Sequence, residues 1–228
     1  MKAMNKKELA GVEAANYVKD GMKVGLGTGS TVYYTIVELG RRVAAGLRIV
    51  GIPTSAATEA LAKELHIPLT TFQACPRLDL TIDGADAVTP DFQLIKGGGG
   101  ALLREKLVAA ASDQLLIVVD DGKLYDSFAN LSIPIEVVPF AWETTAQRIA
   151  NLGGKWTLRE REGVPFVTDN HNYILDTVFD SVADPGRLQD VLKAITGVVE
   201  TGLFINMADA VIVGRADSVE TLSRADSP

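Results

Sequence analysis

Over its first 120 residues the chain alternates short runs rich in Val, Ile and Leu with stretches of helical periodicity. This alternation is the feature that most restricts the fold, because strand–helix–strand order is typical of a parallel sheet covered by helices. The predicted strands are Met22–Leu26, Leu47–Ile52, Leu78–Ile82, Phe92–Ile95 and Leu115–Val119. The predicted helices are Thr31–Ala44, Ala56–Leu65 and Ala101–Ala111.

After Asn130 the order of elements changes. Four strand-like runs and two helical stretches follow in the order β-α-β-β-α-β, which is typical of a split, ferredoxin-like arrangement. The strands are Ile135–Phe140, Lys155–Arg159, Tyr173–Phe179 and Val198–Leu203, and the helices are Thr144–Leu152 and Pro185–Ile195. A last apolar run, Ala210–Gly214, is predicted to rejoin the first sheet.

The predicted fold class is therefore α/β, a Rossmann-like parallel-sheet domain with an inserted ferredoxin-like α+β domain. We expect the Rossmann-like catalytic domain to comprise residues 1–130 and 207–228, and the inserted domain residues 131–206.

Composition excludes several classes of partner. The net charge of −7 disfavours nucleic acid and anionic membrane surfaces. The apolar runs are too short to span a bilayer, and the N-terminus lacks the apolar core of a signal peptide. The single cysteine, Cys75, suits a reducing cytoplasm and is expected to be a packed small residue rather than a catalytic thiol. The two histidines lie far apart with no cysteine cluster near them, so we expect no metal site.

The segment Gly25–Thr31, Gly-Leu-Gly-Thr-Gly-Ser-Thr, lies between a predicted strand and a predicted helix. Alternate glycines let backbone N–H groups approach an anion at a helix N-terminus. A strict dinucleotide motif needs Gly where Ser30 stands and an acid after the second strand, and a P-loop needs Lys where Gly29 stands. The segment therefore predicts a phosphate cradle, and the alternative is a tight turn with an N-cap serine.

Two carboxylates, Asp83 and Asp86, directly follow the strand that ends at Ile82. Open α/β sheets bind ligands at the carboxyl ends of their strands. Carboxylates there can accept hydrogen bonds from sugar hydroxyls or relay a proton. The alternative is an Asx-type turn with a helix cap.

Four successive glycines, Gly97–Gly100, follow Lys96 and precede a helix that carries Glu105 in its first turn. Such a run is conformationally expensive and fits a place where the backbone wraps closely around a ligand. On the helix, Glu105 shares a face with Leu102 and Val108, so partial desolvation is expected to raise its pKa. The alternative is a first-turn glutamate that only satisfies the helix dipole.

Lys123 follows another strand end, in Asp120-Asp121-Gly122-Lys123. Taken alone, this motif is most simply interpreted as a solvated surface lysine. If Lys123 lies near the glycine-rich phosphate cradle, it is a candidate to bind the phosphate.

These four segments, in this order, resemble the type A ribose-5-phosphate isomerase family. The resemblance continues in residues 167–176, Val-Thr-Asp-Asn-His-Asn-Tyr-Ile-Leu-Asp, and in residues 197–204, Gly-Val-Val-Glu-Thr-Gly-Leu-Phe. It therefore spans nearly the whole chain. Two positions depart from the pattern, His171 where many members carry Gly and Gly122 where many carry Ser, and they put only local loop conformation in doubt.

The resemblance implies an aldose–ketose isomerase of the pentose phosphate pathway that interconverts D-ribose 5-phosphate and D-ribulose 5-phosphate through an enediolate. It implies Glu105 as the proton acceptor, assisted by Asp83, Asp86 and Lys96. The implied substrate-binding residues are Thr28, Gly29, Ser30, Thr31, Asp83, Gly84, Ala85, Asp86, Lys96, Gly97, Gly98, Gly99 and Lys123. It also implies a cytoplasmic homo-oligomer, a dimer or tetramer, with no metal or organic cofactor.

Three other classes remain as alternatives. A nicotinamide-dependent redox enzyme is the nearest in fold, and the missing acid after the second strand counts against it. A sugar-phosphate sensor would keep the cradle without needing Glu105, and should carry a basic DNA-binding segment that is not evident. A transferase could use the same carboxylate as a nucleophile.

Overall fold

A computed structural model of the chain describes residues 5–224. Its largest sheet has six strands in the order β15-β14-β6-β3-β1-β2, and all neighbouring strands are parallel except β15, which pairs antiparallel with β14. The strands are β1 (Lys23–Leu26), β2 (Val50–Pro53), β3 (Leu80–Gly84), β6 (Leu115–Asp120), β14 (Ala210–Gly214) and β15 (Val219–Ser223). The predicted return of Ala210–Gly214 to the first sheet is confirmed, whereas β15 was not predicted.

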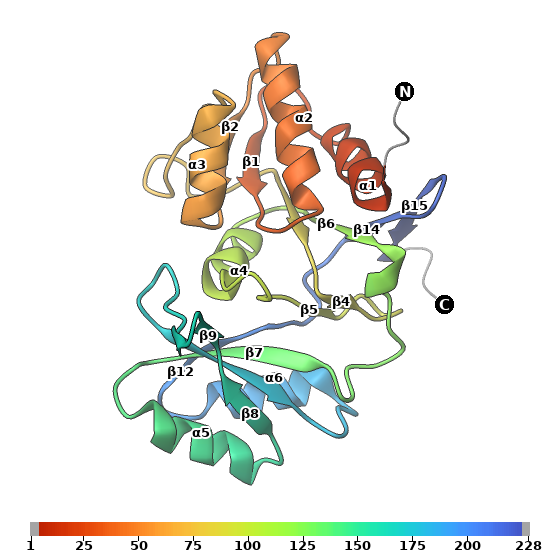
Figure 1. Cartoon of the computed structure of the whole chain (residues 1–228). Helices are drawn as coiled ribbons and strands as arrows, with labels where there is room; N and C mark the ends of the chain where they lie inside the picture. The colour runs from red at the N-terminus through yellow and green to blue at the C-terminus, as the bar shows by residue number, and fades with distance from the viewer. Residues whose placement is uncertain (1–4, 225–228) are drawn as a thin grey trace.

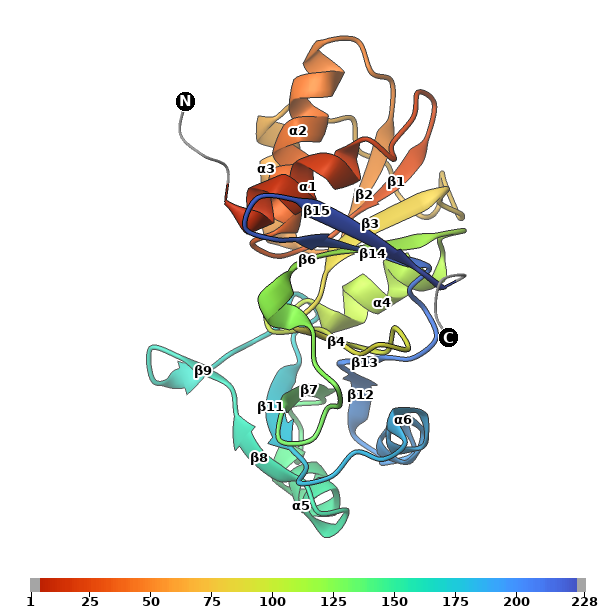
Figure 2. The ribbon, with the colours of Figure 1, turned by 90° about the vertical axis from the view of Figure 1, so that its right-hand side faces the viewer.

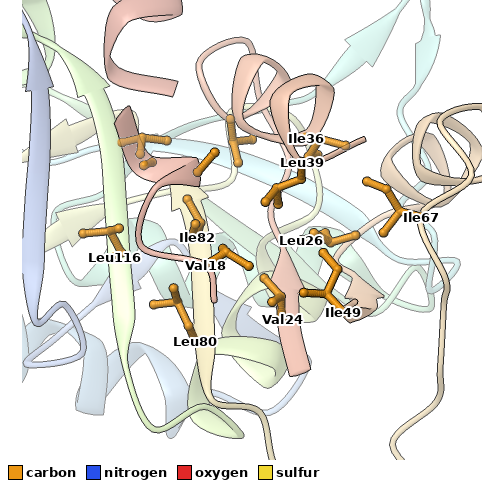
Figure 3. Packing of buried hydrophobic residues seen from close by; sticks show 14 of the residues in the cluster. Val18, Val24, Leu26, Ile36, Leu39, Ile49, Ile67, Leu80, Ile82 and Leu116 are labelled. Atoms are coloured by element: carbon orange, nitrogen blue, oxygen red, sulfur yellow. The ribbon is translucent and has the colours of Figure 1, made fainter. Parts of the chain in front are cut away.

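Both faces of this sheet are buried, as expected for parallel strands. In β6, Leu116 and Val118 face one core, and Leu115, Ile117 and Val119 face another. This alternation follows from the two-residue period of a strand. Figure 3 shows side chains of the first core, in which Leu80 and Ile82 of β3 pack with Ile36 and Leu39 of the helix above.

Three helices contribute to the first core, α1 (Lys6–Ala15), α2 (Val32–Ala44) and α3 (Ala56–Glu64), and Figure 1 shows them in the upper part of the molecule. Helix α1 was not predicted because its buried face consists of small residues, which give no strong apolar period. A Cβ on Gly11 would lie 2.7 Å from the Thr31 carbonyl oxygen and 2.7 Å from the Tyr34 Cβ, so α1 can pack this closely on α2 only through small side chains.

A second sheet has four strands in the order β12-β7-β11-β8, all antiparallel. Its elements are β7 (Ser132–Val137), α5 (Trp142–Asn151), β8 (Lys155–Leu158), β11 (Tyr173–Val178), α6 (Pro185–Lys193) and β12 (Val198–Thr201). The predicted β-α-β-β-α-β order is confirmed, with a small extra hairpin of β9 (Glu160–Arg161) and β10 (Val164–Pro165) between β8 and β11. As predicted, Pro185 lies in the first turn of α6, which Asp184 caps. This sheet has its own core, at the bottom of Figure 1.

The run Phe92–Ile95 was predicted to be a strand of the parallel sheet, and that prediction is wrong. Its last two residues form β5 (Leu94–Ile95) in a separate antiparallel sheet with β4 (Ala87–Val88) and β13 (Leu203–Phe204). A two-residue apolar strand carries no information about its partner. Figure 1 shows β4 and β5, and Figure 2 shows β4 and β13, between the two larger sheets and beside helix α4 (Leu102–Ala110).

The predicted strand Val198–Leu203 is divided into β12 and β13 at Gly202. The Gly202 N–H donates to the Pro134 carbonyl at 2.7 Å, and its own carbonyl accepts from the Lys96 N–H at 2.8 Å. A Cβ on Gly202 would lie 2.3 Å from the Lys96 carbonyl oxygen, so this crossing tolerates only glycine. Gly202 therefore joins the second sheet directly to the start of the glycine-rich loop.

Candidate active site

A pocket opens at the carboxyl ends of β1, β3 and β6. The strand order reverses at β1: β2 lies on one side of this strand, whereas β3 and then β6 lie on the other side. Ligands of open α/β sheets bind at such a reversal. All four segments singled out in the sequence reach this pocket. Its lining consists of Lys7, Thr28, Gly29, Ser30, Thr31, Gly84, Ala85, Asp86, Lys96, Gly97, Gly98, Gly99, Glu105 and Lys123.

The turn after β1 is held from behind by hydroxyl groups. The Thr28 hydroxyl lies 2.7 Å from that of Thr54 and 2.8 Å from that of Ser55. Gly29 has a φ of +142°, a conformation that glycine adopts readily. The N-cap of α2 is Thr31 rather than Ser30, and it makes no side-chain capping bond, so the simple N-cap-serine alternative does not describe this turn.

Beneath the pocket, the Lys96 ammonium lies between two carboxylates. Its Nζ is 3.0 Å from Asp83 Oδ2 and 3.1 Å from Glu105 Oε1, and it also donates to the Gly84 carbonyl. All three side chains are at least 95% buried. Although burial disfavours the charged ammonium, the two carboxylates raise the pKa of Lys96 above its usual range. Lys96 is therefore a fixed positive charge at the base of the pocket.

Glu105 is buried in the first part of α4, on the face that the helical period predicted. Its Oε1 accepts from Lys96, and Oε2 has no hydrogen-bond partner within residues 5–224. Burial raises the pKa of Glu105 to about 8; the Lys96 charge opposes this shift, while the negative charge of Asp83 adds to it. A desolvated carboxylate with one free oxygen at a pocket wall is well suited to accept a proton.

The two aspartates of the 83–86 segment take different positions. Asp86 lines the pocket, and its Oδ2 accepts the Gly98 N–H at 2.7 Å. Asp83 is fully buried and is absent from the lining; its Oδ1 accepts the N–H groups of Thr28 at 3.0 Å and Gly84 at 2.8 Å. A Cβ on Gly27 would lie 2.3 Å from the same oxygen. Asp83 thus ties the ends of β1 and β3 together and holds Lys96.

Lys7 was missed by the sequence reasoning. It lies in the first turn of α1, lines the pocket and donates to the Ser30 hydroxyl at 2.9 Å. Its neighbour Lys6 binds both carboxylate oxygens of Asp121, at 2.7 and 2.9 Å, in the 3-10 turn η1 (Asp121–Lys123). The spacing of Asn5 and Glu8 is a helix-start signal, but no local pattern shows that this helix meets the pocket.

Lys123, for which the resemblance implied substrate binding, ends η1 and lines the pocket. Gly122, one of the two departures, lies in the same turn and donates its N–H to Asp120 at 3.0 Å.

The other departure, His171, has a backbone φ of +62°, in the left-handed region that favours glycine. Glycine adopts this conformation more readily than histidine does. The position is exposed and outside the pocket lining, so the departure is confined to the loop.

Cys75 is 4% exposed and packs with Ile52, Leu78 and Val108, as expected for a small buried residue. Within residues 5–224, no group of three or more His, Cys, Asp and Glu side chains could hold a metal ion. No helix in that range is long and apolar enough to cross a membrane.

Comparison with known proteins gives one consistent result. The family model for ribose 5-phosphate isomerase A (phosphoriboisomerase A) matches residues 50–218. The chain is 54% identical to ribose-5-phosphate isomerase A of Bacillus cereus over 220 residues, which cover 96% of this chain and 100% of the relative.

Two solved structures share the fold over 96% of this chain, both at 38% sequence identity. One is a D-ribose-5-phosphate isomerase in complex with phospho-erythronic acid, with a TM-score of 0.93 and 100% of its chain covered. The other is ribose 5-phosphate isomerase A from Methanocaldococcus jannaschii, with a TM-score of 0.91 and 98% covered.

Proposed function

The chain belongs to the ribose 5-phosphate isomerase A family and is an aldose–ketose isomerase of the pentose phosphate pathway, and from this premise we propose how its pocket performs the reaction. The family decides against the redox, sensor and transferase alternatives. The observation that carries the proposal is Glu105, which lines the pocket beside a buried ammonium and has a buried Oε2 without a hydrogen-bond partner within residues 5–224.

Interconversion of ribose 5-phosphate and ribulose 5-phosphate moves a proton between C2 and C1. We propose that Glu105 removes the proton from C2 of the open-chain aldose and returns it to C1, through a planar enediolate. A second proton passes from O2 to O1, so that the aldehyde at C1 becomes a hydroxyl and the hydroxyl at C2 becomes the ketone. Negative charge then develops on the carbonyl oxygen, and the Lys96 ammonium and backbone N–H groups of the glycine loop stabilise it. Asp86 orients the sugar hydroxyls and assists ring opening, while Asp83 acts through Lys96.

The other end of the pocket suits the phosphate. Two lysines, Lys7 and Lys123, and the hydroxyls of Ser30 and Thr31 line it at the N-terminus of α2. Ammonium groups, hydroxyls and a helix N-terminus all favour a phosphate dianion. This grip supplies position rather than chemistry. Incubation with ribose 5-phosphate, followed by detection of the ketose, tests the proposed reaction directly.

Lys123→Ala is expected to weaken binding of phosphorylated substrate by roughly 1.5–3 kcal/mol, the scale of a charge-assisted hydrogen bond. Affinity for unphosphorylated ribose should hardly change, because Lys123 contacts only the phosphate in this assignment. Lys63→Ala, on the exposed side of α3, serves as the control. Equal losses for both sugars would move Lys123 to the reacting end of the substrate.

We expect activity to persist after exhaustive chelation and dialysis. Lys96 already supplies a fixed positive charge at the base of the pocket, and it can stabilise charge on a carbonyl oxygen as a Lewis-acidic metal ion does. Turnover is measured before and after treatment, and again after each divalent ion is added back. Loss of activity that one ion restores would mean that a metal takes part.

Three further proposals concern the whole protein. We propose a domain division at residues 131–206, supported by the separate cores of the two larger sheets. A homodimer is supported by the 91% exposed Phe140, an apolar side chain that a second copy could cover. A cytoplasmic location is supported by the single, buried Cys75, which has no second cysteine in the chain to pair with.

A further inference from the structure

Arg159 directly follows β8 of the second sheet, yet its guanidinium reaches the glycine loop of the pocket. Its Nη1 donates to the carbonyl oxygens of Gly97 at 2.8 Å and Gly98 at 3.2 Å. Its Nε and Nη2 bind the two carboxylate oxygens of Asp176, at 2.8 and 2.5 Å. The side chain is only 15% exposed, so the fork is held rigidly between β11 and the loop.

These contacts determine which way two peptide units face. In a trans peptide the carbonyl of one residue and the N–H of the next point in opposite directions. Because the Gly97 and Gly98 carbonyls point toward Arg159, the N–H groups of Gly98 and Gly99 point the other way, where both residues line the pocket. The Gly98 N–H meets Asp86, and no acceptor is found for the Gly99 N–H within residues 5–224.

We propose that Arg159, oriented by Asp176, is a positioning residue for catalysis: it holds the Gly97–Gly98 and Gly98–Gly99 peptides so that the Gly98 N–H fixes Asp86 and the Gly99 N–H faces the reacting oxygens. The proposal rests on the isomerase mechanism above. It assigns to the inserted part of the chain a role in the chemistry, although Arg159 does not line the pocket.

The loop cannot hold this arrangement unaided. Gly97 and Gly100 have φ values of +99° and +84°, and glycine peptides have many accessible conformations. A second contact from the same side limits this freedom, because the Phe166 ring packs against Gly100, where a Cβ would lie 2.4 Å from Cζ. The Arg159 guanidinium in turn lies 5.9 Å from the Phe166 ring centroid.

Arginine is needed here for its geometry rather than its charge. A planar guanidinium can bind a carboxylate with one edge and two carbonyl oxygens with another nitrogen. A lysine ammonium at the same place can reach the carboxylate or a carbonyl, but it cannot hold both in fixed directions. We therefore predict that Arg159→Lys, which keeps the positive charge but not the planar guanidinium, retains only part of the wild-type kcat.

The test compares kcat and KM for ribose 5-phosphate in Arg159→Met, Arg159→Lys and Asp176→Asn. Arg161→Met is the matched control, since Arg161 is exposed and also lies near the Phe166 ring, at 5.2 Å. We expect Arg159→Met to lower kcat by about 10²-fold with little change in KM, as misplaced catalytic groups do. Arg159→Lys and Asp176→Asn should show smaller losses in kcat, and Arg161→Met none.

A second readout is inhibition by 4-phosphoerythronohydroxamate, a four-carbon sugar phosphate whose planar, negatively charged head resembles the enediolate. If the Gly99 N–H and the Asp86 carboxylate held by Gly98 serve the transition state, its inhibition constant should rise in parallel with the loss of kcat/KM across the series. A purely structural role would lower the melting temperature without this correlation.

The proposal is overturned if Arg159→Lys and Asp176→Asn both retain wild-type kcat, or if the loss resides entirely in KM. These two variants decide the matter even if Arg159→Met does not fold. Glu105→Gln in the same assay distinguishes failure of the proposed mechanism from failure of the positioning role. Full activity of Glu105→Gln would contradict the mechanism. An inactive Glu105→Gln together with fully active Arg159 variants would contradict only the positioning role.

Discussion

Glu105→Gln is expected to lower kcat by about 10²–10⁴-fold, the usual cost of removing a general base. Glutamine keeps the shape of the side chain and can still accept from Lys96 Nζ, which lies 3.1 Å from Oε1 in the wild type. It cannot accept a proton from carbon. Since the substrate keeps its phosphate and hydroxyl contacts, KM should change far less than kcat. Single-turnover measurements with ribose 5-phosphate would report the loss on the chemical step itself.

The control is Glu64→Gln, because Glu64 is exposed at the end of α3 and outside the pocket lining. Circular dichroism and thermal unfolding would establish that both variants fold. Near-normal turnover in a folded Glu105→Gln protein would remove Glu105 from the mechanism.

The pH profile gives an independent check on the same residue. Only the ionised form of Glu105 can accept a proton, and burial raises its pKa to about 8. We therefore expect kcat/KM to increase with pH through neutrality and to level off above that pKa.

The free energy of unfolding of the wild type should change with pH in the opposite sense to kcat/KM. The folded-state pKa lies above the ordinary value of 4.5, so the contribution of Glu105 is complete below pH 4.5 and is lost as the pH rises through about 8. Glu105→Gln should lack both dependences.

The second large effect concerns a mimic of the enediolate. A four-carbon sugar acid with a terminal phosphate, or its hydroxamate, is expected to bind at least 10²-fold tighter than substrate, at the low end for transition-state analogues. Its planar, negatively charged head resembles the enediolate, which should lie in the pocket against both Glu105 and the Lys96 ammonium. One solved relative is described in complex with phospho-erythronic acid, a compound of this kind. Competitive inhibition constants for the acid and the hydroxamate would measure the effect.

The dephosphorylated acid serves as the matched control for this mimic. Removing the phosphate should abolish most of the affinity, because Lys7, Lys123 and the α2 N-terminus would lose their ligand. If the phosphorylated mimic binds no better than ribose 5-phosphate, the enediolate route is wrong. A hydride shift between C1 and C2 would then become the mechanism to test.

Much of this site could be predicted from local patterns. Glycines and polar side chains directly after strands mark the Gly25–Thr31, Asp83–Asp86 and Lys123 segments, and the carboxyl ends of parallel strands meet at one edge of a sheet. Helical periodicity placed Glu105 on a buried face. The order of strands and helices was sufficient to predict both a parallel and an antiparallel sheet, because periods of 2 and 3.6 residues are properties of the local sequence.

Only the tertiary structure decided which of these groups face the substrate. Asp83 and Asp86 look equivalent in the sequence, yet one is buried beneath Lys96 and the other lines the pocket. The strand before Lys96 is too short for its pairing to be read locally, and it joins a different sheet from the one predicted. Lys7 reaches the pocket from a helix of small residues, and Arg159 reaches the glycine loop from another sheet. Each of these contacts joins residues distant in the chain, and so depends on how whole elements pack rather than on any pattern around the residue itself.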